Sequence, residues 1–424
     1  MKSRQYQKNV AILVSGGGMA GCAAAVAAAR RGHRVLLVEE SNCLGGTATR
    51  GGVSWFYAHL TGMGDIFEQI TDSLRGLDAL DGHFFNGEYL KIVLQQLVEQ
   101  AGVQTLLHAS VVDAGKRRGK ITSVMISCCS QCIEVEADTY IDATGDGDLA
   151  ALAGARFFKG DPDNGRTLHM TLVFFLQDSG RRVQPRLPSG VQPIKIEEDL
   201  PGLHGYRILK DGRVYCTMTK VMGLDPTDPF ELSRAEQEAR RQMVRIVHFL
   251  QSTSLPTFTL CSSAAKIGIR EGRRIIGDYV LTGSDIIEGH ARRFSDGVTV
   301  ATSQIDFHSL TRPGHVGWRK RVDPYPIPYR CLTPNGIKNL LVAGKCISAD
   351  QVAFSSLRMI PTCCSLGQAA GTAAAFTLER KATDVRSIDI TELRGELRRD
   401  GIELDPLKHR PFAPEITDNP ENAF

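Results

Sequence analysis

The chain has 424 residues, which is long enough to bury a large core and to form two domains. Its 50 lysines and arginines against 47 aspartates and glutamates leave a formal net charge of +3, which argues against a nucleic-acid or membrane-surface partner. No apolar run approaches the roughly 18 residues of a membrane-spanning helix. We find no export signal, so we expect the 11 cysteines to be reduced thiols of a cytoplasmic protein.

Residues 10–40 carry the pattern strand, helix, strand. The apolar run 10–14 predicts a buried strand, and an alanine-rich stretch predicts a helix that runs to about Arg31 and stops at Gly32. A second apolar run, 35–38, predicts the neighbouring parallel strand. This order is typical of the first half of a dinucleotide-binding fold.

Three glycines between the first strand and the helix have the spacing of a dinucleotide fingerprint. Gly16 allows the tight turn, Gly18 lets the backbone approach a pyrophosphate, and Gly21 lets the helix pack closely on the strands. The start of the helix favours the anion through its free N–H groups and its dipole. Glu39 follows the second strand 23 positions after Gly16, close to the roughly 20 expected for a carboxylate on an adenosine ribose. Together these parts predict dinucleotide binding.

After the first unit, the sequence predicts further strands and helices, and the pattern changes from about residue 156. A helix at Asn86–Ala101 and a strand at Val103–Leu107 extend the parallel sheet, residues 111–136 predict a small antiparallel meander, and Thr139–Thr144 predicts another strand. From about residue 156 to 330, short strand-like segments alternate with Pro- and Gly-rich stretches. The expected elements there are strands at Leu168–Leu176 and Arg213–Thr219 and a helix at about Phe230–Gln251.

The carboxyl-terminal part returns to the first pattern. Leu340–Gly344 predicts a strand, and Pro361–Leu378 predicts a helix rich in small residues with proline at its start. The two ends of the chain are therefore expected to build one domain, and the middle is expected to build another.

Four blocks of sequence resemble the FAD-dependent oxidoreductases of the glutathione-reductase-like two-domain superfamily, which are distantly similar to flavoprotein subunits of fumarate reductase. Each block alone could be coincidence, whereas the four in this order are specific for the family. The blocks are the glycine fingerprint with Glu39 and the loop Leu44–Thr49, then Ile141–Asp148, then Ile269–Ile275, and then Ile327–Arg330 with Leu341–Ser348, Pro361–Cys363 and Leu366–Gly371.

The resemblance implies an α/β fold: a Rossmann-like FAD-binding domain with a parallel sheet and a small β-meander, plus an inserted β-rich substrate domain. The implied division gives residues 1–155 and 331–385 to the discontinuous FAD-binding domain and 156–330 to the substrate or cap domain. Residues 386–424 are expected to pack on the FAD-binding domain as a carboxyl-terminal tail.

The resemblance also implies which residues bind FAD, which we expect to be held non-covalently. The fingerprint would hold the pyrophosphate and Glu39 the ribose, while the helix that starts at Pro361 would point at the pyrimidine edge of the flavin. The implied cofactor residues are Gly16, Gly18, Met19, Ala20, Gly21, Glu39, Glu40, Gly45, Gly46, Thr47, Thr49, Val112, Ala143, Thr144, Gly145, Asp146, Gly344, Lys345, Pro361 and Thr362.

Four residues near these blocks are candidates for catalysis. Arg330 and Arg358 could hold a substrate carboxylate or polarise a carbonyl, and His308 could act as acid or base. Cys363 opens the helix that is aimed at the flavin, where a helix dipole can lower a thiol pKa, although a role as a small packing residue is favoured. A structural role also remains open for the other three.

Other charged and sulfur-bearing residues are interpreted as structural. Arg270, Arg273 and Arg274 alternate with apolar residues in an expected strand, where pairing with Glu271 or nearby acids is favoured over contact with substrate. The three cysteines within 128–132 lack a fourth ligand nearby, and no metal site is predicted.

The predicted function is hydride transfer between a small organic substrate and N5 of FAD. Disulfide reductases of this superfamily carry a redox cysteine pair after the loop that contains Thr47, and its absence here argues against dithiol exchange. No second glycine fingerprint indicates a nicotinamide domain. Two alternatives remain open: a flavoprotein of RNA modification, and a non-catalytic or electron-transfer FAD subunit. The substrate and the oligomeric state are not predicted.

Overall fold

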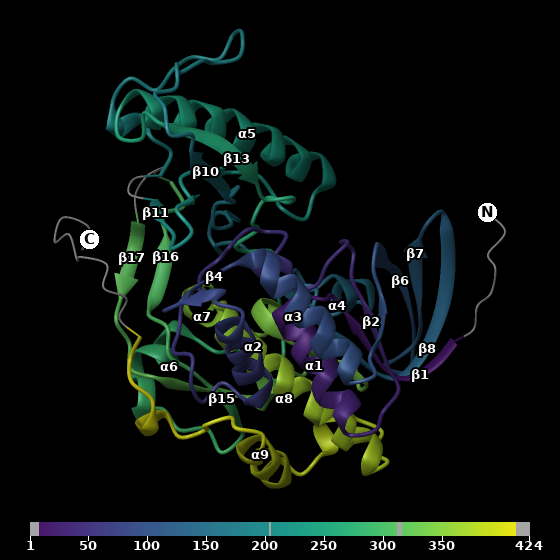
Figure 1. Cartoon of the computed structure of the whole chain (residues 1–424). Helices are drawn as coiled ribbons and strands as arrows, with labels where there is room; N and C mark the ends of the chain where they lie inside the picture. Colours follow the sequence, from purple (N-terminus) through teal and green to yellow (C-terminus); the bar gives the residue numbers. More distant parts are fainter. Residues whose placement is uncertain (1–7, 203–204, 312–315, 413–424) are drawn as a thin grey trace.

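A computed structural model describes residues 8–202, 205–311 and 316–412 of the chain (Figure 1). The strands of its larger sheet are β1 (Lys8–Ser15), β2 (Val35–Val38), β5 (Gln104–Leu106), β6 (Ala109–Arg117), β7 (Lys120–Cys128), β8 (Gln131–Asp142) and β19 (Leu340–Val342). They lie in the order β5-β2-β1-β8-β7-β6, with β19 also paired to β8. Strands β5, β2, β1, β8 and β19 pair in parallel, and β6, β7 and the start of β8 form an antiparallel meander. The predicted α/β fold with a parallel sheet and a small meander is therefore confirmed.

Two helices from opposite ends of the chain lie side by side against this sheet. They are α1 (Met19–Arg30) and α8 (Ile360–Glu379) (Figure 1). A Cβ at Gly367 would stand 2.0 Å from the carbonyl oxygen of Ala20, and one at Gly371 would stand 2.2 Å from that of Ala24. The glycines of α8 therefore allow backbone contact with α1. Because 20 faces 367 and 24 faces 371, the two helices run in the same direction, and α8 starts about two turns ahead of α1.

A second, smaller unit lies at one end of the molecule (Figure 1). Its sheet has the order β11-β12-β10-β13, and helix α5 accompanies it; the bounds are β10 (Phe174–Asp178), β11 (Tyr206–Ile208), β12 (Val214–Cys216), β13 (Phe258–Ser263) and α5 (Pro229–Ser252). The side chain of Asp228 caps α5 by accepting the N–H groups of Phe230 and Glu231. The unit has its own hydrophobic cluster, built from residues between Met170 and Ile267.

The predicted strands of this region are too long, and that prediction is wrong in part. Of Leu168–Leu176 only the last three residues lie in β10, and of Arg213–Thr219 only Val214–Cys216 forms a strand. The reason is local: the N–H of Leu172 donates to the hydroxyl of Thr219 at 2.7 Å, so a side chain takes the place of a ladder partner.

The remaining elements surround the two sheets. Residues beyond the small unit return to the large core, since Ile275, Tyr325 and Ile327 belong to the same hydrophobic cluster as β1 and α8. The bounds are α2 (Asp65–Gly76), β3 (Leu80–Asp81), β4 (Phe84–Phe85), α3 (Gly87–Gln100), α4 (Asp148–Leu152), β9 (Phe157–Lys159), β14 (Arg273–Ile275), α6 (Gly283–Glu288), β15 (Gly297–Ala301), β16 (Ile305–His308), β17 (Val316–Lys320), β18 (Tyr325–Pro328), α7 (Gln351–Leu357) and α9 (Ile390–Arg399).

Candidate active site

The glycine fingerprint forms a tight loop between β1 and α1. Gly16 has φ +99°, and a Cβ there would stand 2.4 Å from the carbonyl oxygen of Ala143. A Cβ at Gly21 would stand 1.8 Å from the carbonyl oxygen of Gly16, so the close approach of helix and loop requires glycine at both positions. Gly18 caps α1 without a side-chain hydrogen bond and has open space where a Cβ would be. The first N–H groups of α1 are thus available to a ligand.

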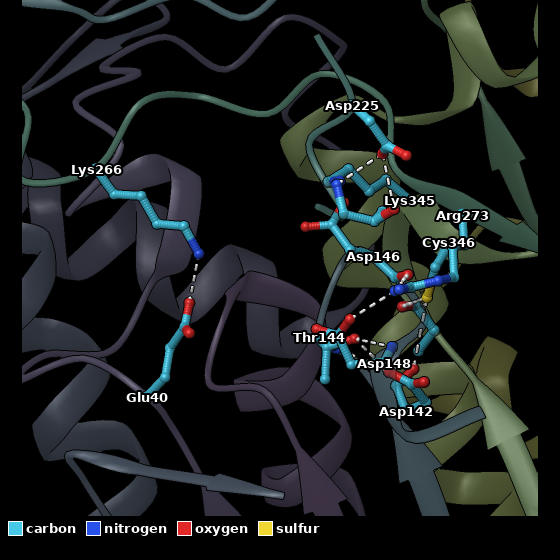
Figure 2. Close-up of polar contacts among 12 residues, drawn as sticks. Glu40, Asp142, Thr144, Asp146, Asp148, Asp225, Lys266, Arg273, Lys345 and Cys346 are labelled. Atoms are coloured by element: carbon cyan, nitrogen blue, oxygen red, sulfur yellow. Dashed lines mark hydrogen bonds and ion pairs between the residues drawn. The ribbon is translucent and has the colours of Figure 1, made fainter. Parts of the chain in front are cut away.

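Glu39 closes the other side of this loop. It follows β2, is only 3% exposed, and its carboxylate accepts the N–H of Gly17 at 2.6 Å and that of Ser41 at 2.9 Å. The guanidinium of Arg50 lies 3.6 Å from it. Glu40 points elsewhere: its half-exposed carboxylate pairs with Arg50 and with Lys266, which comes from the small unit (Figure 2). The adjacent acids therefore share Arg50, but Glu39 otherwise accepts backbone N–H groups of the loop whereas Glu40 pairs with Lys266.

A turn rich in aspartate follows β8. The buried carboxylate of Asp142 accepts the N–H of Thr144 at 3.0 Å, its hydroxyl at 2.7 Å and the N–H of Ala150 at 2.7 Å (Figure 2). These bonds end the strand at 142, so the predicted strand Thr139–Thr144 is wrong in its last two residues. Burial raises the pKa of Asp142 to about 6. Asp146 forms an ion pair with Lys345, which joins this turn to the residues after β19.

These segments line a cleft of about 350 Å³ that continues past the start of α8. Most of the predicted cofactor residues line it: Gly16, Gly18, Met19, Ala20, Glu39, Gly45, Gly46, Thr47, Ala143, Thr144, Gly145, Asp146, Gly344 and Lys345. The other predicted positions are not part of its lining: Gly21, Glu40, Thr49, Val112, Pro361 and Thr362.

Several of these other residues have visible structural roles. The hydroxyl of Thr49 donates to the carbonyl oxygen of Leu44 at 2.7 Å, which fixes the loop before it. Val112 is 47% exposed on β6. Thr362 is fully buried in the first turn of α8, and its hydroxyl has no hydrogen-bond partner in the described part of the chain.

The far end of the cleft holds a charged cluster centred on Asp306. Asp306 and His308 are two residues apart in β16 and therefore share a face, while Arg319 stands opposite Asp306 in the register with β17. The Asp306 carboxylate lies 3.0 Å from Nε2 of His308, 3.1 Å from Nε of Arg319 and 3.2 Å from Nη2 of Arg358. Each of the four side chains lines the cleft.

The protonation states of the cluster follow from burial. Its cationic neighbours hold the pKa of Asp306 well below its usual value, although burial alone would raise it. Burial lowers the pKa of His308 to about 4, despite the attraction of Asp306. His308 is therefore a neutral imidazole at pH 7. Its Nε2–H faces the carboxylate, and its buried Nδ1 has no partner in the described part of the chain.

Arg270 lines the same end of the cleft, and no carboxylate of the described residues pairs with it. Its guanidinium donates to the carbonyl oxygen of His169 at 3.2 Å and to the hydroxyl of Thr171. Burial and the charge of Arg358 lower its pKa to about 10, so it stays cationic at pH 7. The pairing expected with Glu271 is taken up by Arg274, which forms a buried ion pair with that carboxylate.

Two of the candidates for catalysis have environments that limit their chemistry. Arg330 lies outside the cleft lining, where it pairs with Asp296 at 2.9 Å and stacks over Tyr279. Cys363 does line the cleft, but burial raises its pKa to about 12. The expected lowering by the helix dipole is outweighed, so Cys363 stays a thiol at pH 7.

The residues that line the cleft are suited to binding FAD. The cleft offers an uncapped helix start beside Gly18 at one end, a buried acid at Glu39, and the first turn of α8 further along. Such a row of N–H donors and small residues is suited to a long, anionic dinucleotide. Within the described ranges, no group of three or more His, Cys, Asp or Glu side chains is placed to hold a metal ion.

A family model described as FAD dependent oxidoreductase matches residues 11–397. The chain belongs to this family. It is accordingly an oxidoreductase that uses FAD. No curated protein matches the chain. None of the helices in the described residues is long and apolar enough to cross a bilayer.

Several solved structures resemble the chain only distantly. A geranylgeranyl bacteriochlorophyll reductase-like protein from Thermoplasma acidophilum has 13% identity and a TM-score of 0.49, over 95% of this chain and 86% of that one. An anhydrotetracycline hydroxylase from Streptomyces rimosus has 13% identity and a TM-score of 0.45, over 94% and 70%. A myxobacterial FAD-dependent halogenase has 13% identity and a TM-score of 0.44, over 92% and 79%.

Proposed function

We propose that this enzyme transfers a hydride between a small organic substrate and FAD, with the substrate at the Asp306 end of the cleft. The observation that carries this proposal is the continuity of one cleft from the glycine loop to the charged cluster. When bound, FAD supplies the hydride acceptor or donor at its N5 atom. The protein's part is to bind and orient the substrate and to handle the proton that accompanies the hydride.

The residues of the glycine end would hold the cofactor. We assign the N–H groups at the start of α1 to the pyrophosphate and Glu39 to the ribose, because Gly18 opens to the cleft and Glu39 is fixed beside it. Lys345, tied to Asp146, would place a cation along the cleft wall. The start of α8 lies about two turns further on, which fits the flavin end of the molecule.

The domain division is part of the same proposal. The hydrophobic cluster between Met170 and Ile267 is separate from that of the large sheet, which supports a substrate unit within the proposed range 156–330. The large cluster also contains Ile275, Tyr325 and Ile327. We therefore assign the cap to about residues 170–270 and return the segment after it to the FAD-binding domain.

His308 is our candidate for the proton-transferring group. Asp306 accepts its Nε2–H, which fixes the tautomer and leaves the lone pair of Nδ1 without a partner. A neutral imidazole in this state can take a proton from a substrate. Arg358 fits the role of orienting the substrate better than Arg330 does, because only Arg358 lies in the cleft.

The test is an anaerobic screen of the FAD-loaded enzyme with small alcohols, amines, hydroxy acids and saturated acids, followed by absorbance. We expect at least one class to bleach the oxidised flavin, and a His308→Gln variant to bleach more slowly by about 10²-fold or more. A flavin that no small molecule reduces would contradict the proposal and favour an electron-transfer subunit. Tight binding of tRNA would favour the RNA-modification alternative.

A further inference from the structure

The charged end of the cleft has more positive than negative charge. Arg270, Arg319 and Arg358 all line it, and Asp306 is the carboxylate that faces them. Lys220 stands close enough to Arg270 that burial and this like charge lower its pKa to about 8. Even with Lys220 partly neutral, the three guanidiniums outnumber the single carboxylate. An anion would restore the balance.

Asp306 pairs directly with side chains other than Arg270. Its two oxygens already lie at ion-pair distance from His308, Arg319 and Arg358. In the described residues, no carboxylate stands within 4 Å of the Arg270 guanidinium, whose partners are a carbonyl and a hydroxyl. A cation that is removed from water without a counter-ion is costly, and the cost is recovered when an anionic ligand binds there.

Unused hydrogen-bonding atoms surround the same place. Among the residues that the structure describes, Nε of Arg358, Nδ1 of His308 and Nε2 of His169 are buried without hydrogen-bond partners. The rings of His169 and His308 stand edge to face at 4.6 Å between centroids, so these atoms belong to one cluster. His308 is 8% exposed and His169 is 2% exposed. Buried polar atoms are normally paired, so these three atoms leave the hydrogen bonding of the cluster incomplete.

The wall next to the charges is apolar and aromatic. It is formed by Trp55, Val173, Tyr215, Ile269, Met359 and Ile360. A guanidinium offers two parallel N–H donors that match the two oxygens of a carboxylate, and the apolar wall suits a carbon skeleton beside it. A free inorganic anion would use the charges but not this wall.

We propose that the substrate is a small organic carboxylate whose carboxylate group is bound by Arg270, with Arg358 beside it. This inference rests on the proposed function for the assignment of this end of the cleft to substrate. It adds the charge and class of the substrate, which the family assignment leaves open. The neutral, unpaired nitrogens of His169 and His308 would contact polar groups on the remainder of the ligand.

The test uses three probes of one shape and different charge: benzoate, benzamide and benzylamine. Each is titrated into the FAD-loaded protein by calorimetry and by flavin difference absorbance. We expect benzoate to bind at least tenfold more tightly than benzamide, and benzylamine not to bind, because charge-assisted hydrogen bonds are worth roughly tenfold to hundredfold in affinity. Acetate and inorganic phosphate complete the series and should bind more weakly than benzoate.

Variants locate the carboxylate. Arg270→Gln should weaken benzoate binding about tenfold to hundredfold, and Arg270→Lys should weaken it less. The control is Arg241→Gln, a position 61% exposed on α5, which should change nothing. Thermal melting and flavin content show whether the variants are folded. If Arg270→Gln does not fold, the comparison of probes on the unaltered protein still decides the question.

The outcomes separate this inference from the proposed function. Equal affinity for benzoate and benzamide, preference for phosphate, or full affinity in folded Arg270→Gln would overturn the carboxylate assignment while leaving the flavin reaction intact. If the protein cannot be loaded with FAD, the proposed function fails. Calorimetry on the FAD-free protein then still measures whether Arg270 binds a carboxylate.

Discussion

The two ends of the cleft are built by different means. The end that carries the glycine loop is formed largely by backbone: a side chain at Gly16 or Gly21 would clash with a neighbouring carbonyl oxygen, and Gly18 leaves open space beside the helix start. The other end, where we propose that the substrate binds, is formed by side chains from separate segments, of which Arg270, Asp306, Arg319 and Arg358 carry the charge. A site built from the backbone of one loop requires glycines at a fixed spacing in the sequence. A site built from side chains requires only that these residues meet in space, so their positions in the sequence can be far apart.

The largest expected effect is at the backbone end. Gly21→Ala would place a Cβ 1.8 Å from the carbonyl oxygen of Gly16, so α1 must move away from the loop. We expect affinity for FAD to fall by about 10²-fold or more, since overpacking at a tight contact costs roughly 1–3 kcal/mol or more. The measurement is the flavin content and FAD dissociation constant of the purified variant. Gly76→Ala is the control, because nothing lies within 4 Å of a Cβ there.

At the side-chain end of the cleft, Asp306→Asn removes the negative charge that pairs with Arg319 and Arg358. We expect the free energy of unfolding at pH 7 to fall by about 3–5 kcal/mol, because breaking a buried ion pair strands its partners. Urea denaturation measures this change. Asp72→Asn, at a position 72% exposed, should cost little. A stability loss of the same small size for both variants would show that the cluster is not electrostatically coupled.

The neutral state of His308 predicts a pH dependence. Its pKa is lowered from 6.5 to about 4, so the unfolded chain binds an additional proton as pH falls from 6.5 to 4. The free energy of unfolding is therefore unaffected by this group above pH 6.5 and falls as the pH is lowered from 6.5 to 4. At pH 4.5 the loss amounts to about 2–3 kcal/mol. His308→Gln should reduce the slope of unfolding free energy against pH, which urea denaturation at several pH values measures.

The adjacent acids Glu39 and Glu40 make a matched pair for the cofactor end. Glu39→Gln weakens two buried charge-assisted hydrogen bonds in the loop, and we expect FAD affinity to fall by about 1.5–3 kcal/mol. Glu40→Gln alters a half-exposed ion pair and should change both stability and affinity by less than about 1 kcal/mol. If both variants lost FAD affinity to the same extent, this would contradict the different environments of Glu39 and Glu40.

The contrast between the two ends also explains what the sequence could predict. The fingerprint and the turn after β8 lie within short stretches, and the positions expected there at Gly16, Glu39 and Ala143 do line the cleft. Arg270 could not be assigned, because local spacing favoured a pair with Glu271, and only the fold shows that this acid is taken by another arginine. Long-range pairing decides such cases.

One signal at the substrate end was present in the sequence. Asp306 and His308 are two residues apart, which places them on one face of a strand, so the acid beside the candidate histidine could have been recognised. The strand register that brings Arg319 opposite Asp306 could not be predicted from the sequence, because it depends on a bulge between Phe307 and His308. The predicted strands Leu168–Leu176 and Arg213–Thr219 are too long for a related reason: a side-chain hydrogen bond between Leu172 and Thr219 replaces the backbone ladder there.

We expect the cleft to hold FAD at its glycine-rich end. The absorption spectrum of the purified protein, taken before and after denaturation and filtration, tests this directly. We predict a flavin band near about 450 nm and the release of one FAD by denaturant. A colourless protein that cannot be reconstituted with FAD would contradict it.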